Sequence, residues 1–360
     1  MKASANLPLW TIASPVLGWL LLAAGTLQLG AWFYGVLLLG LFAAVLAAVH
    51  HAEVVAHRVG EPFGTLLLAV AITTIEVVLI VSMMMSAGAS GAELARDTVF
   101  AAVMIILNGI IGLCLLLGAS RHREQTFHQH GVNASLTTLA AIVVLTLVLP
   151  NYTESVPGPY YSPSQLAFIA LVSLVLYGTF VLVQTVRHRD YFLVVDANAA
   201  GQDHHEPPST RTPVLSGALM LIGLGAVVLL AKALAPVLES GVEAIGAPQA
   251  FVGVIIALFV LLPEGLAAIT AARHNRLQTS LNLALGSALA SIALTIPVVA
   301  AVSLWQGWPL ALGIDQKSTV LLVLSLMVAT LSFGTGRTTI MQGAVHLVLF
   351  AAYLFTSVIP

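Results

Sequence analysis

Long apolar runs separated by short polar breaks dominate this 360-residue chain. A helix needs about 20 mainly apolar residues to cross the hydrocarbon core of a bilayer. Eleven stretches fit this requirement, and the pattern therefore predicts an all-α polytopic membrane protein with eleven transmembrane helices. The predicted spans are 9–28, 32–50, 62–86, 98–118, 133–150, 164–186, 213–235, 249–272, 279–303, 318–334 and 339–358.

Composition supports the same class of protein. Hydrophobic residues make up 59% of the chain and charged residues 8%, whereas soluble proteins carry about 25% charged residues. The 13 Lys and Arg side chains form no basic stripe, so no nucleic-acid partner is expected. The single cysteine, Cys114, cannot form an internal disulfide. The expected surroundings are the lipid bilayer, and no oligomeric state is predicted.

The positive charges predict an orientation, because Lys and Arg collect in the cytoplasmic loops of membrane proteins. With a cytoplasmic N-terminus, three of them are external, namely Arg96, Lys232 and Lys317. We therefore expect a bacterial-type cytoplasmic (inner) membrane protein with its N-terminus in the cytoplasm and its C-terminus outside. The other ten are Lys2, Arg58, Arg121, Arg123, Arg187, Arg189, Arg211, Arg273, Arg276 and Arg337.

A polar stretch at 187–212 interrupts the apolar pattern and is predicted to be a mildly acidic cytoplasmic linker. If 1–30 is an extra N-terminal helix, five helices remain in 31–186 and five in 213–360. An odd number of helices per unit forces the two units into opposite orientations. Inverted repeats of this kind are typical of secondary transporters.

Two glutamates lie inside otherwise uncharged apolar runs, Glu76 in 62–80 and Glu264 in 251–266. A phenylalanine precedes each by thirteen positions, and the predicted topology places the two acids on oppositely directed helices. A charged acid at mid-bilayer costs roughly 2.5 to 3.5 kcal/mol, so it faces the protein interior and has a partner. The matched positions favour a duplicated cation and proton site over two protonated acids that only bond across helix interfaces.

Nearby groups add candidate oxygen ligands. Pro263 lacks an N–H and releases the Phe259 carbonyl near Glu264, although such prolines also act as simple kinks. Thr73 precedes Glu76 and could supply a hydroxyl, although threonines often bond to their own helix.

The next helix of each half also carries polar residues at corresponding places. Asn108 is a candidate ligand or neighbour of the site, as are Ser287 and Ser291. The alternative for the two serines is close helix packing.

These groups predict exchange chemistry. Two neighbouring carboxylates titrate as a coupled pair with raised proton affinity, and a cation between them favours their charged forms. Protons and a metal cation therefore compete for the same oxygens. No cofactor is expected, and the absence of a nucleophile with its base or of a metal motif disfavours an enzyme. A cation channel is the less favoured alternative, because no filter sequence is visible.

Several stretches resemble the cation/Ca²⁺ exchanger superfamily, in its Ca²⁺/H⁺ antiporter branch and most closely the bacterial ChaA-type Ca²⁺/H⁺ and Na⁺(K⁺)/H⁺ antiporters. The resemblance covers almost the whole chain. It implies an extra first helix, two inverted five-helix repeats, and cation and proton binding at Glu76 and Glu264. The stretches are 60–66 leading to 75–77, 96–98, 263–266, 278–297 and 332–338.

The chain departs from the pattern of that superfamily at the ligands. Ca²⁺/H⁺ exchangers commonly show Gly-Asn-Ala-x-Glu in each repeat, whereas this chain has Ile-Thr-Thr-Ile-Glu at 72–76 and Val-Leu-Leu-Pro-Glu at 260–264. Met104 stands where the family often has a small hydroxyl residue. Ca²⁺ takes six to eight oxygen ligands, so a monovalent Na⁺(K⁺)/H⁺ antiporter with little Ca²⁺ transport is the alternative.

The remaining charged residues have weaker assignments. Glu53 is a candidate cytoplasmic entry for cations, and His204 and His205 are candidate pH sensors, with solvated side chains as the alternative in each case. His346, inside the last span, is expected to be a packing residue with satisfied hydrogen bonds. Two further groups are expected to be exposed ion pairs, Glu93 with Arg96 and Asp97, and Asp315 with Lys317.

Overall fold

The computed structural model describes residues 7–25, 30, 32–59, 63–193 and 211–359. Two compact units make up the chain, residues 1–87 with 204–245 (unit 1) and residues 88–203 with 246–360 (unit 2). Within the described residues, nine helices are long and apolar enough to cross a membrane, and Leu9–Gly25 and Val70–Met85 are shorter apolar helical stretches. Each of the eleven predicted spans coincides with one of these helices.

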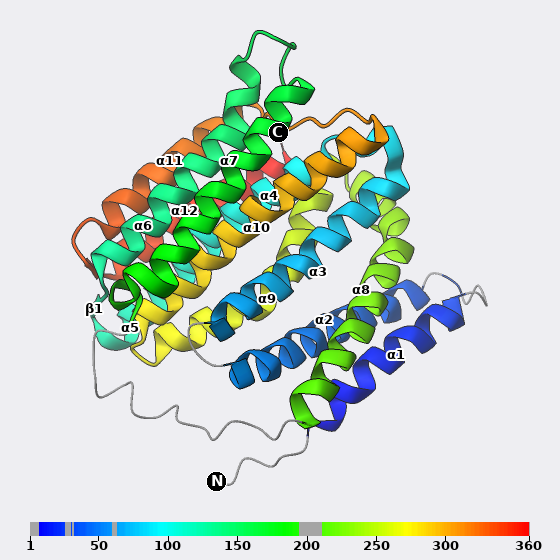
Figure 1. The fold of residues 1–360 in the computed structure, drawn as a ribbon, viewed down its shortest axis with the longest axis horizontal. Coiled ribbons are helices and arrows are strands. Elements are labelled where there is room, and N and C mark those ends of the chain that lie inside the picture. Colours follow the sequence, from blue (N-terminus) through cyan, green and yellow to red (C-terminus); the bar gives the residue numbers. More distant parts are fainter. Residues whose placement is uncertain (1–6, 26–29, 31, 60–62, 194–210, 360) are drawn as a thin grey trace. The chain divides into compact units, whose positions relative to one another are not determined.

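The described residues of unit 1 form four helices, of which α1 and α2 lie antiparallel (Figure 1). His51 Nε2 lies 3.0 Å from the Thr11 carbonyl oxygen, and at the other end of the pair Gly40 packs against Leu21. The Leu21 side chain occupies the space that a side chain at position 40 would fill. Small residues permit this close packing between membrane helices. The helices are α1 (Leu9–Gly25), α2 (Trp32–Val59), α3 (Phe63–Ala87) and α8 (Arg211–Ala244).

The helix α8 runs parallel to α1. A Cβ at Gly223 would lie 3.7 Å from Pro15 Cγ, and three residues further along both helices a Cβ at Gly18 would lie 3.0 Å from Ala226 Cβ. Since α2 is antiparallel to α1, it is also antiparallel to α8.

Unit 2 contains the other described elements. Its central rod, α4–η2–α5, is buried along most of its length and passes through a π-helical turn at η2. The bounds are η1 (Gly88–Gly91), α4 (Leu94–Met104), η2 (Ile105–Ile110), α5 (Ile111–His122), β1 (Gln125–Thr126), α6 (Gln129–Val143), η3 (Val144–Val148), η4 (Leu149–Tyr152), α7 (Pro163–Leu182), η5 (Val183–Arg187), η6 (Arg189–Phe192), α9 (Ala250–Arg273), α10 (Leu277–Gln306), α11 (Gln316–Phe333), β2 (Arg337–Thr338) and α12 (Ile340–Val358).

The helices of unit 2 run between two ends. At the end where α5 finishes (Figure 1), β1 pairs antiparallel with β2, and the Gln125 side chain donates to the Ala272 carbonyl at the end of α9 over 2.9 Å. At the opposite end, where α4 begins, the Ala311 N–H donates to the Ala92 carbonyl over 3.1 Å. We call these the β-ribbon end and the loop end.

These contacts fix the direction of each helix in unit 2. The rod α4–α5 runs towards the β-ribbon end and α10 runs away from it, while α6 finishes at the loop end, where α11 begins. The helix α12 starts beside β2 and ends near Lys317, which donates to the Thr356 carbonyl over 2.7 Å. The start of α7 follows Pro159, whose carbonyl accepts from the Leu312 N–H at the loop end.

The directions confirm the predicted inversion. Four pairs of helices at equivalent places in the two halves run antiparallel: α2 with α8, α4–α5 with α10, α6 with α11, and α7 with α12. The fifth pair, α3 and α9, belongs to different units. Each compact unit takes helices from both halves of the sequence, and the proposed repeat boundaries stay a prediction.

Some predicted helix ends are wrong. The helices α2 and α8 continue to Val59 and Ala244, nine residues past the predicted 50 and 235. Hydrophobicity stops at the predicted positions, but a helix continues until a residue terminates it, and the left-handed Gly246 (φ 70°) follows the end of α8. The helix α4 begins at Leu94 and not at 98, which places Arg96 and Asp97 inside its first turn.

Candidate functional site

The structure brings together one predicted pair of site residues. The Ser287 hydroxyl on α10 donates to Glu264 Oε1 on α9 over 3.0 Å, and both side chains are partly buried. A hydroxyl has one hydrogen and two lone pairs, so the same group can donate to a carboxylate or face a cation. The pair therefore offers two kinds of oxygen at one place in an apolar helix interface.

Two glycines allow α9 to pack closely against the central rod. A Cβ at Gly253 would lie 2.9 Å from the Thr98 backbone nitrogen, and a Cβ at Gly265 would lie 3.2 Å from Ile110 Cδ1. The twelve-residue spacing places one contact near the start of α9 and the other directly after Glu264. The position of Glu264 therefore depends on the backbone of α4 and on the Ile110 side chain of η2.

The proline that precedes Glu264 does not end its helix, since α9 is continuous from Ala250 to Arg273. Pro263 has no N–H to donate to the Phe259 carbonyl, and that oxygen stays a candidate ligand. Ser291 lies one helical turn beyond Ser287 on α10 and is buried, with 1% of its surface exposed. Both remain predictions as ligands.

Asn108 lies in η2 with its side chain fully buried. Its amide nitrogen donates to the Ser325 hydroxyl of α11 over 2.8 Å, and its amide oxygen lies 3.4 Å from His346 Nδ1 of α12. These contacts direct Asn108 towards α11 and α12. The sequence predictions did not include Ser325 or Ser332. Their seven-residue spacing puts them on one face of an apolar helix, and this pattern is a signal that could have identified them.

In unit 1, Glu76 and Thr73 lie three residues apart on α3, and they are 3% and 4% exposed. Residues at this spacing share a helix face, so the hydroxyl and the carboxyl group are on the same buried side. The hydroxyl of Thr74 donates to the Val70 carbonyl of its own helix over 2.7 Å, as expected for threonines that bond locally.

The cytoplasmic candidates are only partly described. Glu53 is half-buried on α2, and its role at an entry stays a prediction. His51 contacts the Thr11 carbonyl and the His50 ring lies tilted against Trp10, so both rings connect α2 to α1. His204 and His205 lie outside the described residues.

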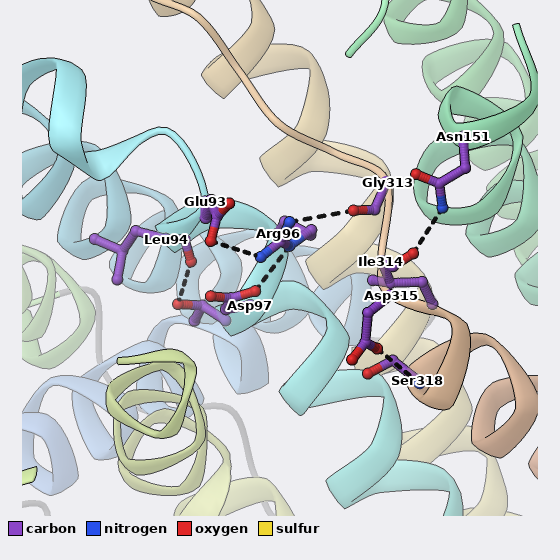
Figure 2. Close-up of polar contacts among 10 residues, drawn as sticks. Glu93, Leu94, Arg96, Asp97, Asn151, Gly313, Ile314, Asp315 and Ser318 are labelled. Carbon is purple, nitrogen blue, oxygen red and sulfur yellow. Dashed lines mark hydrogen bonds and ion pairs between the residues drawn. The ribbon is translucent and has the colours of Figure 1, made fainter. Parts of the chain in front are cut away.

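The charged group at the loop end differs in part from the prediction of exposed pairs, because Glu93 is 59% exposed whereas Arg96 and Asp97 are largely buried (Figure 2). Arg96 Nε donates to Asp97 Oδ1 over 2.8 Å, and the two side chains are only 14% and 15% exposed. Arg96 also donates to Glu93 over 3.0 Å and to the Gly313 carbonyl over 3.1 Å. Burial follows from the early start of α4, which carries Arg96 and Asp97 into the helix packing.

The prediction of an ion pair between Asp315 and Lys317 is also wrong. Asp315 accepts from the Ser318 N–H over 2.8 Å and caps the start of α11, while Lys317 donates to the Thr356 carbonyl. A carboxylate at this position satisfies a free backbone N–H of the first turn. Beside it, Asn151 donates to the Ile314 carbonyl over 2.6 Å (Figure 2). Among the described residues, no three His, Cys, Asp or Glu side chains group together as a metal site.

Comparisons with known proteins place the chain among ion exchangers. The sequence profile of the family described as sodium/calcium exchanger protein matches residues 27–186 and 215–359. A protein described as a putative ionic transporter, y4hA of Sinorhizobium fredii (strain NBRC 101917 / NGR234), is 52% identical and covers 99% of this chain and 98% of its own. The sodium-potassium/proton antiporter ChaA of Escherichia coli (strain K12) is 37% identical, over 89% of this chain and 87% of its own.

A solved structure has the same fold. The structure of native YfkE matches with a TM-score of 0.74 over 98% of this chain and 99% of that chain, at 18% identity. At this identity the likeness establishes the fold alone. YfkE is described as a Ca²⁺/H⁺ antiporter protein.

Proposed function

Because the chain belongs to the sodium/calcium exchanger protein family, we propose that it is a secondary antiporter that exports Ca²⁺, Na⁺ or K⁺ in exchange for H⁺. The observation that carries this proposal is the Glu264 carboxyl group, which lies within an apolar helix and accepts a hydrogen bond from Ser287 of the next helix. Small cations and protons are the proposed substrates, and the protein is a transporter and not an enzyme.

The proposed mechanism is competition at Glu264 and at Glu76. Burial favours the neutral acid, so a proton bound to either carboxyl group stabilises it in the apolar interior. Loss of the proton creates a hard anionic oxygen ligand. A cation then binds there, and Ser287 can turn its lone pair towards the cation beside Glu264. Each acid thus holds a proton or contributes to cation binding.

Na⁺(K⁺)/H⁺ exchange with little Ca²⁺ transport is the second candidate. Residues 72–76 and 260–264 carry no amide side chain, and Asn108 hydrogen bonds to Ser325 and His346. Fewer neutral oxygen ligands disfavour Ca²⁺, which takes six to eight. The name of the 37% identical relative, a sodium-potassium/proton antiporter, supports this candidate.

The test uses everted membrane vesicles that carry a pH gradient. Addition of Ca²⁺, Na⁺ or K⁺, each in a separate assay, is expected to dissipate the gradient with the wild-type protein. Glu76→Gln and Glu264→Gln keep the side-chain size but cannot ionise, so each is expected to abolish the response. Cation flux without proton movement would contradict antiport, and a full response in both variants would exclude these two acids.

A further inference from the structure

A continuous chain of hydrogen bonds joins three helical elements inside unit 2. His346 Nε2 lies 3.2 Å from the Ser332 hydroxyl, and Nδ1 lies 3.4 Å from the Asn108 amide oxygen. The Asn108 amide nitrogen donates to Ser325, which in turn donates to the Leu321 carbonyl over 2.7 Å. His346, Asn108 and Ser325 are fully buried and Ser332 is 5% exposed.

The chain has one direction, which determines the form of the histidine. The Ser325 hydrogen goes to Leu321, so Ser325 accepts from Asn108, and the Asn108 oxygen must then accept from Nδ1–H. Neutral histidine has one donor and one acceptor nitrogen, so Nε2 accepts from the Ser332 hydroxyl. Neutral His346 therefore satisfies both neighbours without placing a charge in the protein interior.

This chain of hydrogen bonds contacts an unusual part of the helix backbone. Asn108 lies in η2, a π-helical turn, and such turns are rare and frequently occur at functional sites. The helix α12 also packs closely against α5, which follows η2. A Cβ at Gly112 would lie 3.1 Å from His346 Cβ. The α12 histidine thus sets where η2 lies.

The η2 turn also contacts the helix of Glu264 directly. Ile110, the last residue of η2, packs against Gly265, where an added Cβ would lie 3.2 Å from the isoleucine Cδ1. Gly265 follows Glu264, which accepts from Ser287 over 3.0 Å. A displacement of η2 would therefore move the α9 backbone at Glu264 and change this distance.

From this geometry we infer that His346 is a positioning residue for the cation and proton site at Glu264. It acts through Asn108 and Ile110 and touches no transported ion. The inference rests on the proposed function. It predicts that loss of the hydrogen-bond chain weakens cation binding at Glu264 while the protein still folds and inserts.

The experiment measures the cation concentration for half-maximal exchange and the maximal rate in everted vesicles. His346→Leu leaves the buried Asn108 oxygen without its donor, and the half-maximal concentration is expected to rise about tenfold. His346→Gln supplies a donor and an acceptor again and is expected to stay within about threefold of wild type. Ser332→Ala removes one hydroxyl and is expected to raise the value about threefold.

Leu349→Ala is the matched control, because Leu349 is a buried residue of α12 outside the chain of hydrogen bonds. It is expected to lower the amount or thermal stability of the protein without moving the half-maximal concentration. A wild-type value in His346→Leu, or an equal shift in Leu349→Ala, would overturn the inference. If His346→Leu does not accumulate, an unchanged half-maximal concentration in Ser332→Ala overturns the inference.

The two proposals fail in different ways. An absence of cation-dependent proton movement in wild-type vesicles would contradict the proposed function and therefore also this inference. Normal exchange in the wild type together with normal exchange in the His346 and Ser332 variants would remove only the inference.

Discussion

A carboxyl group inside an apolar helix needs either a proton or a compensating partner, and Glu264 has a hydroxyl 3.0 Å away. The Ser287 hydroxyl can therefore also orient the Glu264 carboxyl group when no cation is bound. The cost of losing such a donor is about 1 to 3 kcal/mol when the acceptor stays buried. A substitution of Ser287 is therefore expected to weaken the site without removing the charge of Glu264.

Ser287→Ala is expected to raise the half-maximal cation concentration about tenfold in the vesicle assay, since the partly buried Glu264 carboxylate loses the hydrogen bond from Ser287. Ser287→Thr keeps the hydroxyl and is expected to retain most of the affinity. Ser173→Ala is the control, because that buried serine donates only to the Ile169 carbonyl of its own helix. Equal effects of Ser287→Ala and Ser173→Ala would argue against a specific role for Ser287.

At this scale the sequence predicted part of the site. Ser287 was a candidate because it is a polar residue in the apolar span after that of Glu264, and the structure contains a hydrogen bond between the two side chains. The partners of Asn108 could not be predicted, because they depend on which helix covers η2 and on the extra residue in a π-helical turn. Burial of Arg96 was missed because charge alone suggests an exposed side chain.

At the scale of elements, glycines decide how closely α9 approaches the central rod. Gly253 places the α9 backbone against Asp97 and Thr98, which lie in the turn that Arg96 holds to the Gly313 carbonyl. Close backbone approach of this kind is available only where no side chain intervenes. The number and order of the helices followed from apolar run length, whereas the contacts between helices required the structure.

Gly253→Ala is expected to destabilise the purified protein by about 1 to 3 kcal/mol, because the new methyl group would overpack a backbone contact. A lower melting temperature in detergent would measure this. Gly178→Ala on α7 is the control, since an added Cβ there meets nothing within 4 Å, and alanine favours a helix over glycine by roughly 0.5 to 1 kcal/mol. A melting temperature for Gly253→Ala at or above that of Gly178→Ala would contradict the proposed contact.

At the scale of the molecule, positive charge is unequal between the two ends of unit 2. Arg123 and Arg337 adjoin β1 and β2 at the β-ribbon end, and Arg273 and Arg276 adjoin the end of α9 beside it. The loop end carries Arg96, which is engaged by two acids, and Lys317. The positive-inside rule then supports the proposal that the β-ribbon end is cytoplasmic.

Accessibility to a membrane-impermeant maleimide tests this orientation in a Cys114→Ser background. Ser155→Cys, exposed at the loop end, is expected to react in intact cells. Glu124→Cys, exposed next to β1, is expected to react only after the membrane is permeabilised. The opposite labelling pattern would reverse the proposed topology, and both variants should retain exchange activity as a check on folding.

The hydrogen bonds at both ends of unit 2 limit how its helices can move. The central rod is joined to α9 through Gln125 and Ala272 at one end, and to the loop before α11 through Arg96 and Gly313 at the other. One helical turn is a 5.4 Å step along the axis, and a slide of that size would break the contacts at both ends together. Tilting the rod about its middle displaces its two ends the most, so the same contacts also oppose tilting, and the rod is expected to move together with α9 and with the loop before α11.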